Sequence, residues 1–191
     1  MRRYLPALAV LLLALTFQAA DARDRLSIGI TQYPSTLNPN IDSMAAKSYV
    51  HGFTHRPITQ FNAAWELQCW LCLELPDLEA GTAEVVERAD GTQGVKTRYS
   101  IHPEARWGDG TPVTTADVAF TIEVGKHPES GFSNAELYRR IVELEIVDDK
   151  TFVIEDEKLT FLYPAINDLR LLPAHLERPV FEADPATYRN R

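Results

Sequence analysis

Cysteine is scarce in this 191-residue sequence, which contains only Cys69 and Cys72. Two cysteines exclude a disulfide-rich scaffold and a zinc site with four thiolate ligands. Basic residues are also in the minority, because 19 Lys and Arg stand against 27 Asp and Glu, giving a net charge of −8. An acidic chain of this kind is not a nucleic-acid binder by charge.

Long hydrophobic runs are absent after residue 22, so we expect no transmembrane helix there. The beginning of the chain is different. An arginine pair precedes an apolar run from Leu5 to Phe17, and small residues follow in Ala20-Asp21-Ala22. This pattern predicts a secretory signal peptide over residues 1–22, cleaved near Ala22, and hence a periplasmic location. It leaves open whether the general secretory or the twin-arginine route is used.

Catalytic motifs are absent too, since the sequence has no Gly-x-Ser-x-Gly elbow and no phosphate-binding loop. His51 and His55 have the spacing of a zinc-binding pair on a helix. Gly52 stands where a metalloprotease motif has Glu, and no spacing in the sequence requires a third ligand. We therefore expect no enzyme, cofactor or metal. An exported metal-dependent hydrolase that uses His51 and His55 is the alternative.

Cys69 and Cys72 enclose Trp70 and Leu71. An oxidising compartment permits a disulfide between them, and two packed thiols are the other reading. Redox catalysis is not expected, because a reactive Cys-x-x-Cys pair lies at a helix N-terminus, whereas Leu75-Pro76 follows here.

Hydrophobic periodicity and turn residues predict a mixed α+β fold. The strands expected are 26–30, the hairpin of 83–88 with 95–101, and the hairpin of 141–147 with 151–155. In the first hairpin, Asp90-Gly91 supplies the turn signal. Alternation along its second strand predicts one buried face and one wet face.

Four helices are expected. The first begins at Asp42 or Ser43 as cap and runs to about Phe53. The second follows the tight turn 107–112, is capped at Thr114 or Thr115, and stops at Gly125. Asp117 completes a capping box with Thr114. The others are 160–169, weakened by Pro164, and a short helix opened by Asp184-Pro185.

The segment Trp107-Gly108-Asp109-Gly110-Thr111-Pro112-Val113-Thr114, followed by Asp117-Val118, resembles the signature of extracellular solute-binding proteins of the peptide/nickel class, family 5. Thr36-Leu37-Asn38-Pro39 is similar to the family's segment after its first strand. Asp149-Lys150-Thr151 resembles its turn between paired strands. Leu171-Leu172-Pro173-Ala174-His175 resembles a later segment, so the resemblance covers most of the chain after residue 22.

The resemblance implies the substrate-binding component of a peptide-type ABC transporter. Such a protein is expected to be a monomer that binds a peptide or similar small solute and delivers it to a membrane permease. It also implies a two-lobe fold around a cleft, of which residues 23–191 are the N-terminal part, without the second lobe. A fragment of this kind is expected to bind peptide weakly or not at all, and a truncated, non-transport binding role is a further alternative.

Ligand-binding residues follow from the same resemblance. Asp42, Ser43 and Met44 match the stretch that borders the ligand in the family. Arg170, just before Leu171, is a candidate partner for a ligand carboxylate, with a plain surface arginine as the other reading. The ligand itself is left open among oligopeptides, dipeptides, nickel chelates, sugars and opines.

Overall fold

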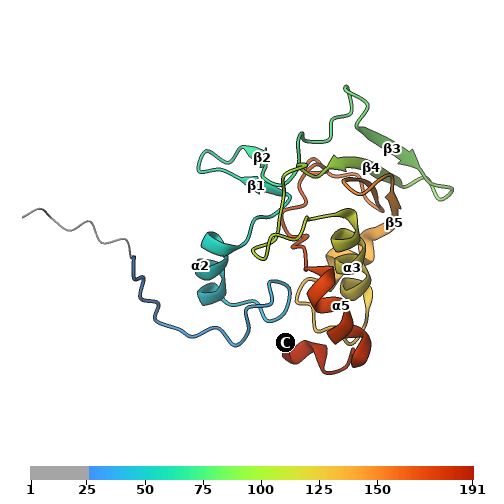
Figure 1. Ribbon diagram of the computed structural model, residues 1–191. Helices are drawn as coiled ribbons and strands as arrows, with labels where there is room; N and C mark the ends of the chain where they lie inside the picture. The colour runs from blue at the N-terminus through green and yellow to red at the C-terminus, as the bar shows by residue number, and fades with distance from the viewer. Residues whose placement is uncertain (1–25) are drawn as a thin grey trace, which may run out of the picture. The chain divides into compact units, whose positions relative to one another are not determined.

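A four-stranded antiparallel sheet with strand order β3-β4-β6-β5 frames the fold (Figure 1). The computed structural model describes residues 26–191, so the predicted signal peptide lies outside the described residues. Residues 32–191 form one unit, and residues 26–31 belong to a separate N-terminal unit. The strands of the sheet are β3 (Ala83–Glu87), β4 (Gln93–Ser100), β5 (Ile141–Ile146) and β6 (Thr151–Asp156).

Both predicted hairpins are confirmed, and the pairing of β4 with β6 joins them. The alternation along β4 is also confirmed, because Val95 and Tyr99 are each 1% exposed whereas Lys96 and Arg98 face the other side. The sheet therefore has one buried face and one wet face.

The helices are α2 (Ala45–Thr54), α3 (Thr115–Lys126), α4 (Ala135–Arg140) and α5 (Ala174–Ala183), and a 3₁₀ turn spans Tyr188–Asn190. α3 packs against both α4 and α5, and it lies beside α5 in Figure 1. A separate two-stranded sheet, β1 (Thr59–Phe61) with β2 (Leu67–Cys69), was not predicted. Its strands are only three residues long, which is too short for a period of two to be recognised.

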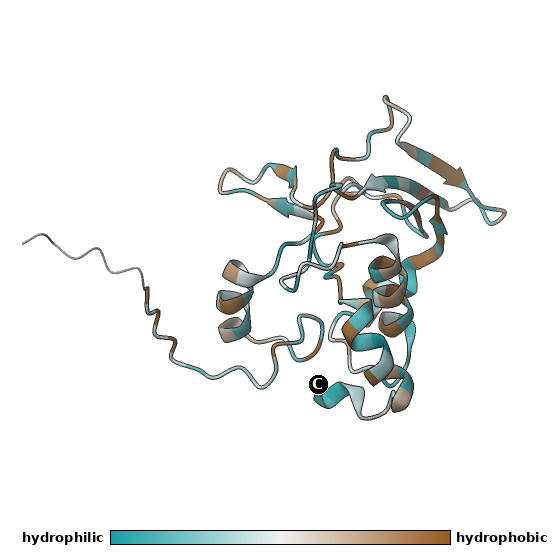
Figure 2. Cartoon of the chain, viewed as in Figure 1, coloured by the Kyte–Doolittle hydropathy of each residue, from teal (hydrophilic) through white to brown (hydrophobic). Residues whose placement is uncertain are grey.

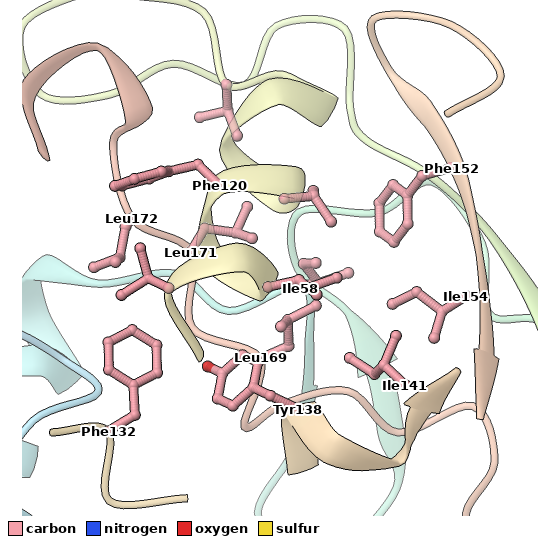
Figure 3. Packing of buried hydrophobic residues seen from close by; sticks show 14 of the residues in the cluster. Ile58, Phe120, Phe132, Tyr138, Ile141, Phe152, Ile154, Leu169, Leu171 and Leu172 are labelled. Carbon is pink, nitrogen blue, oxygen red and sulfur yellow. The ribbon is translucent and has the colours of Figure 1, made fainter. Parts of the chain in front are cut away.

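The core lies between the sheet and α3. Phe152 and Ile154 from β6 face the interior, where Ile58 and Phe120 are fully buried (Figure 3). Leu171 belongs to the same cluster although its segment is irregular. Burying side chains of this size contributes roughly 1.5–3 kcal/mol each, so the cluster fixes α3 and the segment before α5 against the sheet.

The predicted start of α3 is confirmed, whereas the predicted stop is wrong. Thr114 is the N-cap, and its backbone N–H donates to the Asp117 carboxylate at 2.9 Å, as in a capping box. Gly125 does not end the helix, which continues to Lys126. A Cβ atom at Gly125 would overlap the ring of Tyr138, so this glycine permits a close approach between α3 and α4.

Two other predicted elements are wrong. Residues 26–30 do not form a strand, because within residues 26–191 no strand pairs with them. Residues 160–169 form turns in place of a helix. Pro164 cannot donate a helical hydrogen bond, and its carbonyl accepts from Tyr99 Oη at 3.1 Å. The Ile166 N–H donates to Thr59 Oγ1 at 2.9 Å, so tertiary partners replace helical ones.

The two ends of the fold also differ from prediction. α2 begins after Met44, because Asp42 has a φ of 54° and its carboxylate accepts from Ser35. The last helix, α5, lies before Asp184, which is followed by a 3₁₀ turn only. α5 was missed because it contains Pro179. It carries both hydrophobic and hydrophilic residues (Figure 2), and Phe181 is its buried residue.

Candidate functional site

A pocket of about 180 Å³ opens beside the N-terminus of α2, and we call it the Ser43 pocket. It is lined by residues from three separate parts of the chain: Pro39, Asn40, Ser43, Met44, Lys47, Ser48, Ser133, Asn134, Tyr138, Asp168 and Arg170. Three of the four residues predicted to border a ligand, Ser43, Met44 and Arg170, therefore lie together. Asp42 is adjacent in sequence but does not line the pocket.

Lys47 holds the loop before α2 in place. Its Nζ donates to the carbonyl oxygens of Asn38 (2.9 Å), Ile41 and Asp42, and the side chain is buried. Burial lowers the pKa of Lys47, the nearby Asp42 opposes this shift, and Arg170 adds to it. A buried ammonium group with three carbonyl partners fixes the backbone of residues 38–42, and this backbone carries Ser43 to the rim of the pocket.

Arg170 is positioned through its main chain. Its carbonyl oxygen accepts from Asn40 Nδ2 at 2.8 Å, and Asn40 Oδ1 accepts in turn from Tyr138 Oη at 3.2 Å. The guanidinium makes a long contact of 3.5 Å to the Pro39 carbonyl. Within residues 26–191 it forms no ion pair with a carboxylate. A partly buried arginine in this state can still bind an anion.

A second pocket of about 270 Å³ shares Ser48 and Arg170 with the first, and we call it the His55 pocket. His51 and His55 line it, together with Gly52, Pro57, Gln60, Trp70 and Asn167. Arg170 lines both pockets, so the two pockets share this residue. The polar and aromatic lining suits a solute that has both a charged and an apolar part.

Burial disfavours the charged form of both histidines. Burial lowers the pKa of His55 to about 4, and the neighbouring His51 and Arg170 act in the same direction. The pKa of His51 is also lowered, first by burial and then by Arg170 and Lys47. Among the described residues, no group of three or more His, Cys, Asp or Glu side chains could hold a metal ion. The hydrolase alternative therefore lacks a third ligand in residues 26–191.

A disulfide joins Cys69 and Cys72, whose Cα atoms are 5.0 Å apart. The loop that it closes presents Trp70 to the His55 pocket. The N–H groups of Trp70 and Leu71 both donate to the Ile58 carbonyl, at 2.9 and 3.1 Å. The guanidinium of Arg56 lies over the Trp70 ring, 5.9 Å from its centre. These contacts hold the loop between the two cysteines in place, so the disulfide is part of a fixed structural loop.

Several lining residues were not singled out from the sequence, among them Lys47, Asn134, Tyr138 and Asp168. Their positions along the chain are far apart, and no spacing connects them. The turn 107–112, the strongest motif of the sequence, does not line either pocket. Its Trp107 Nε1 donates to Asp117 at 3.1 Å, so this motif has a structural role.

The family follows from a match that includes the turn 107–112. Residues 83–190, more than half of the chain, match the family described as bacterial extracellular solute-binding proteins, family 5, middle region. The chain belongs to this family. The predicted resemblance is therefore confirmed, as is the α+β fold of part of a periplasmic binding protein.

Solved structures of oligopeptide-binding proteins have a similar fold. The chain is 31% identical to the oligopeptide-binding protein of Thermus thermophilus complexed with a pentapeptide, with a TM-score of 0.68 over 80% of this chain. It is 17% identical to the oligopeptide-binding protein AppA of Bacillus subtilis, complexed with a nonapeptide, with a TM-score of 0.62 over 81% of this chain. Both of these structures are of oligopeptide-binding proteins.

The chain spans only part of its relatives. It covers 25% of the Thermus chain and 28% of the Bacillus chain. Over 79 residues, 40% of this chain, it is 30% identical to the uncharacterized protein y4wM of Sinorhizobium fredii, of which it covers 12%. Within residues 26–191, no helix combines the length and the apolar character needed to cross a membrane.

Proposed function

We propose that the protein is the substrate-binding component of a peptide-type ABC importer, and that it delivers a peptide or similar small solute to a membrane permease. Membership of the family supports this role. The observation that carries the proposal for the ligand is Arg170, which lines two adjoining pockets and forms no ion pair within residues 26–191. In this proposal Ser43 and Met44 border the ligand in the Ser43 pocket, on one side of Arg170. Trp70 borders the ligand in the His55 pocket, on the other side of Arg170.

The solute in this proposal carries a carboxylate. An unpaired guanidinium recognises a carboxylate through two parallel N–H···O bonds, and a peptide offers one at its C-terminus. Asn134 and Ser133 on the rim of the Ser43 pocket add side chains that can hydrogen-bond to a peptide backbone. Loose side-chain requirements of this kind are typical of peptide receptors.

A comparison of two peptides tests the proposal. Tri-alanine and its C-terminal amide differ only in the carboxylate. We expect Arg170→Gln to weaken binding of tri-alanine at least about tenfold, because a charge-assisted hydrogen bond contributes about 1.5–3 kcal/mol. Binding of the amide should be unchanged. NMR shift titration is suitable, since it registers millimolar affinity. Arg139→Gln is the control, because Arg139 pairs with Glu136 on the exposed side of α4.

Two results would contradict the proposed ligand contact. One is an equal loss of affinity for tri-alanine and its amide in Arg170→Gln, and the other is no loss for either. The proposal also includes export and removal of residues 1–22. Mass spectrometry of the periplasmic protein should then find Arg23 near the N-terminus, and a stable periplasmic product that begins at Met1 would contradict this part.

A further inference from the structure

The two histidines of the His55 pocket contribute an aromatic wall to it. Both ring nitrogens of His51 and the Nε2 of His55 are buried beneath the surface of the protein. The rings that line the pocket therefore present mainly carbon atoms to it. Their centres are 5.6 Å apart in an edge-to-face arrangement, which is a favoured packing of aromatic rings.

Trp70 adds a third aromatic ring to the same pocket. The Arg56 guanidinium lies over this ring, yet Trp70 is still 43% exposed. The disulfide and the hydrogen bonds of the Trp70 and Leu71 N–H groups to the Ile58 carbonyl hold the loop that carries the ring. A ring that is exposed but held in place loses little conformational freedom when a ligand packs against it.

The formal charge in the lining of the His55 pocket has one sign. Arg170 lines the pocket, and among the described residues neither Asp nor Glu does. Burial, and after it the positive charge of Arg170, lowers the pKa of His51, so this charge acts inside the pocket. A cationic side chain of a ligand is repelled there. An acidic side chain competes with a C-terminal carboxylate for one guanidinium, whereas a neutral side chain does neither.

We propose that the His55 pocket is a specificity pocket for an aromatic side chain on the C-terminal residue of a bound peptide, with Trp70 and His55 as the residues that select it. This inference rests on the proposed function, in which the C-terminal carboxylate binds Arg170. Because Arg170 lines this pocket, the side chain of the residue that carries the carboxylate is the one that enters it. A phenyl ring packed against Trp70 and His55 gains from burial and from the preference of aromatic rings for one another.

Tripeptides that differ in one side chain test the inference by NMR shift titration. We expect Ala-Ala-Phe to bind at least about tenfold more tightly than tri-alanine, because burial of a Phe side chain is worth that factor or more. Phe-Ala-Ala has the same composition with the ring at the other end, and it should lack this gain. Ala-Ala-Lys and Ala-Ala-Glu should bind no more tightly than tri-alanine, because of the charge of Arg170.

Substitutions in the pocket locate the source of the preference. Trp70→Ala should remove most of the gain from Ala to Phe, His55→Ala should reduce it, and both should leave the affinity for tri-alanine unchanged. Trp65→Ala is the matched control, because Trp65 is 83% exposed and lies outside both pockets, and it should change nothing. Circular dichroism shows whether each variant is folded.

A measurement on the unchanged protein does not depend on the folding of any variant. Nuclear Overhauser effects should connect the phenyl protons of bound Ala-Ala-Phe with the indole protons of Trp70. Their absence overturns the inference, as does an undiminished preference for Ala-Ala-Phe in folded Trp70→Ala. Equal affinities of Ala-Ala-Phe and Phe-Ala-Ala, or tighter binding of Ala-Ala-Lys or Ala-Ala-Glu than of Ala-Ala-Phe, overturn it too.

The specificity pocket and the carboxylate contact of the proposed function fail separately. A protein that binds tri-alanine through Arg170 and shows no preference for Ala-Ala-Phe overturns only the specificity pocket. A protein that prefers Ala-Ala-Phe through Trp70, yet binds the C-terminal amide of this peptide as tightly, overturns only the carboxylate contact and leaves the aromatic contact standing.

Discussion

The carboxylate of Asp117 accepts a hydrogen bond from the backbone N–H of Ala174 at 2.8 Å, across 57 residues of sequence. It also accepts from the N–H of Thr114 at 2.9 Å and from Trp107 Nε1 at 3.1 Å. One buried side chain, 3% exposed, therefore connects the turn 107–112, the start of α3 and the start of α5.

The first prediction concerns this connection. Asp117→Ala leaves three donors without a partner, and each buried donor costs roughly 1–3 kcal/mol. We expect the free energy of unfolding to fall by about 3 kcal/mol or more in a urea titration. Glu123→Ala is the control on the same helix, because Glu123 forms an exposed pair with Arg178, and its effect should stay within about 1 kcal/mol. Equal effects of the two substitutions would contradict the role of Asp117 as the shared acceptor of these three hydrogen bonds.

A second prediction uses two helical glycines. Gly→Ala inside a helix normally stabilises by roughly 0.5–1 kcal/mol, and we expect this for Gly52→Ala, where a Cβ meets nothing within 4 Å. Gly125→Ala should instead destabilise by about 1–3 kcal/mol, because the methyl group overlaps the Tyr138 ring. Thermal unfolding measures both. If both variants gained stability, the close approach of α3 and α4 would be disproved.

The third prediction concerns the turn at Gly110, whose φ is +88°. A β-branched side chain is strained in this region by roughly 1–2 kcal/mol or more. Gly110→Val should therefore lower the thermal midpoint. Gly108→Val is the matched control two residues away, where φ is ordinary and the space is open. A midpoint equally low in both variants would refute the role of the positive φ.

The fourth prediction is a pH dependence. A hydrogen bond from His175, with Asp109 Oδ2 2.7 Å from His175 Nε2, lowers the pKa of Asp109 to about 2, and the Thr111 N–H contributes. A carboxyl group with a lowered pKa stabilises the fold above its ordinary pKa of about 3.9. That stabilisation is lost as the pH falls through the folded-state pKa near 2.

Asp109→Asn should accordingly lower the thermal midpoint at pH 5–6, and the two proteins should converge near pH 2. Calorimetry across this range measures the effect. His175→Gln, which removes the largest cause of the shift, should show the same trend. A difference that grows as the pH falls below 3 would contradict the stated direction.

The sequence by itself determined the local elements. Asp90-Gly91 and Gly110 specify turns because glycine adopts positive φ without strain, and Thr114 with Asp117 specifies a helix start because their groups are three residues apart. The alternation of Val95, Lys96 and the following residues specifies which face of β4 is buried. The segment that contains Gly110, Thr114 and Asp117 also carried the resemblance to the family.

Only the tertiary structure decided the rest. Residues 160–169 had a helical pattern, yet Tyr99 and Thr59 supplied hydrogen-bond partners from distant strands. α5 formed despite Pro179, because Phe181 is buried against Phe120 and Tyr188.

The pockets depend on tertiary structure in the same way, because Ser43 and Arg170 are 127 positions apart and only folding places them together. Local spacing controls hydrogen bonds within a few residues. Burial and long-range contacts depend on the whole chain, and those contacts build the site.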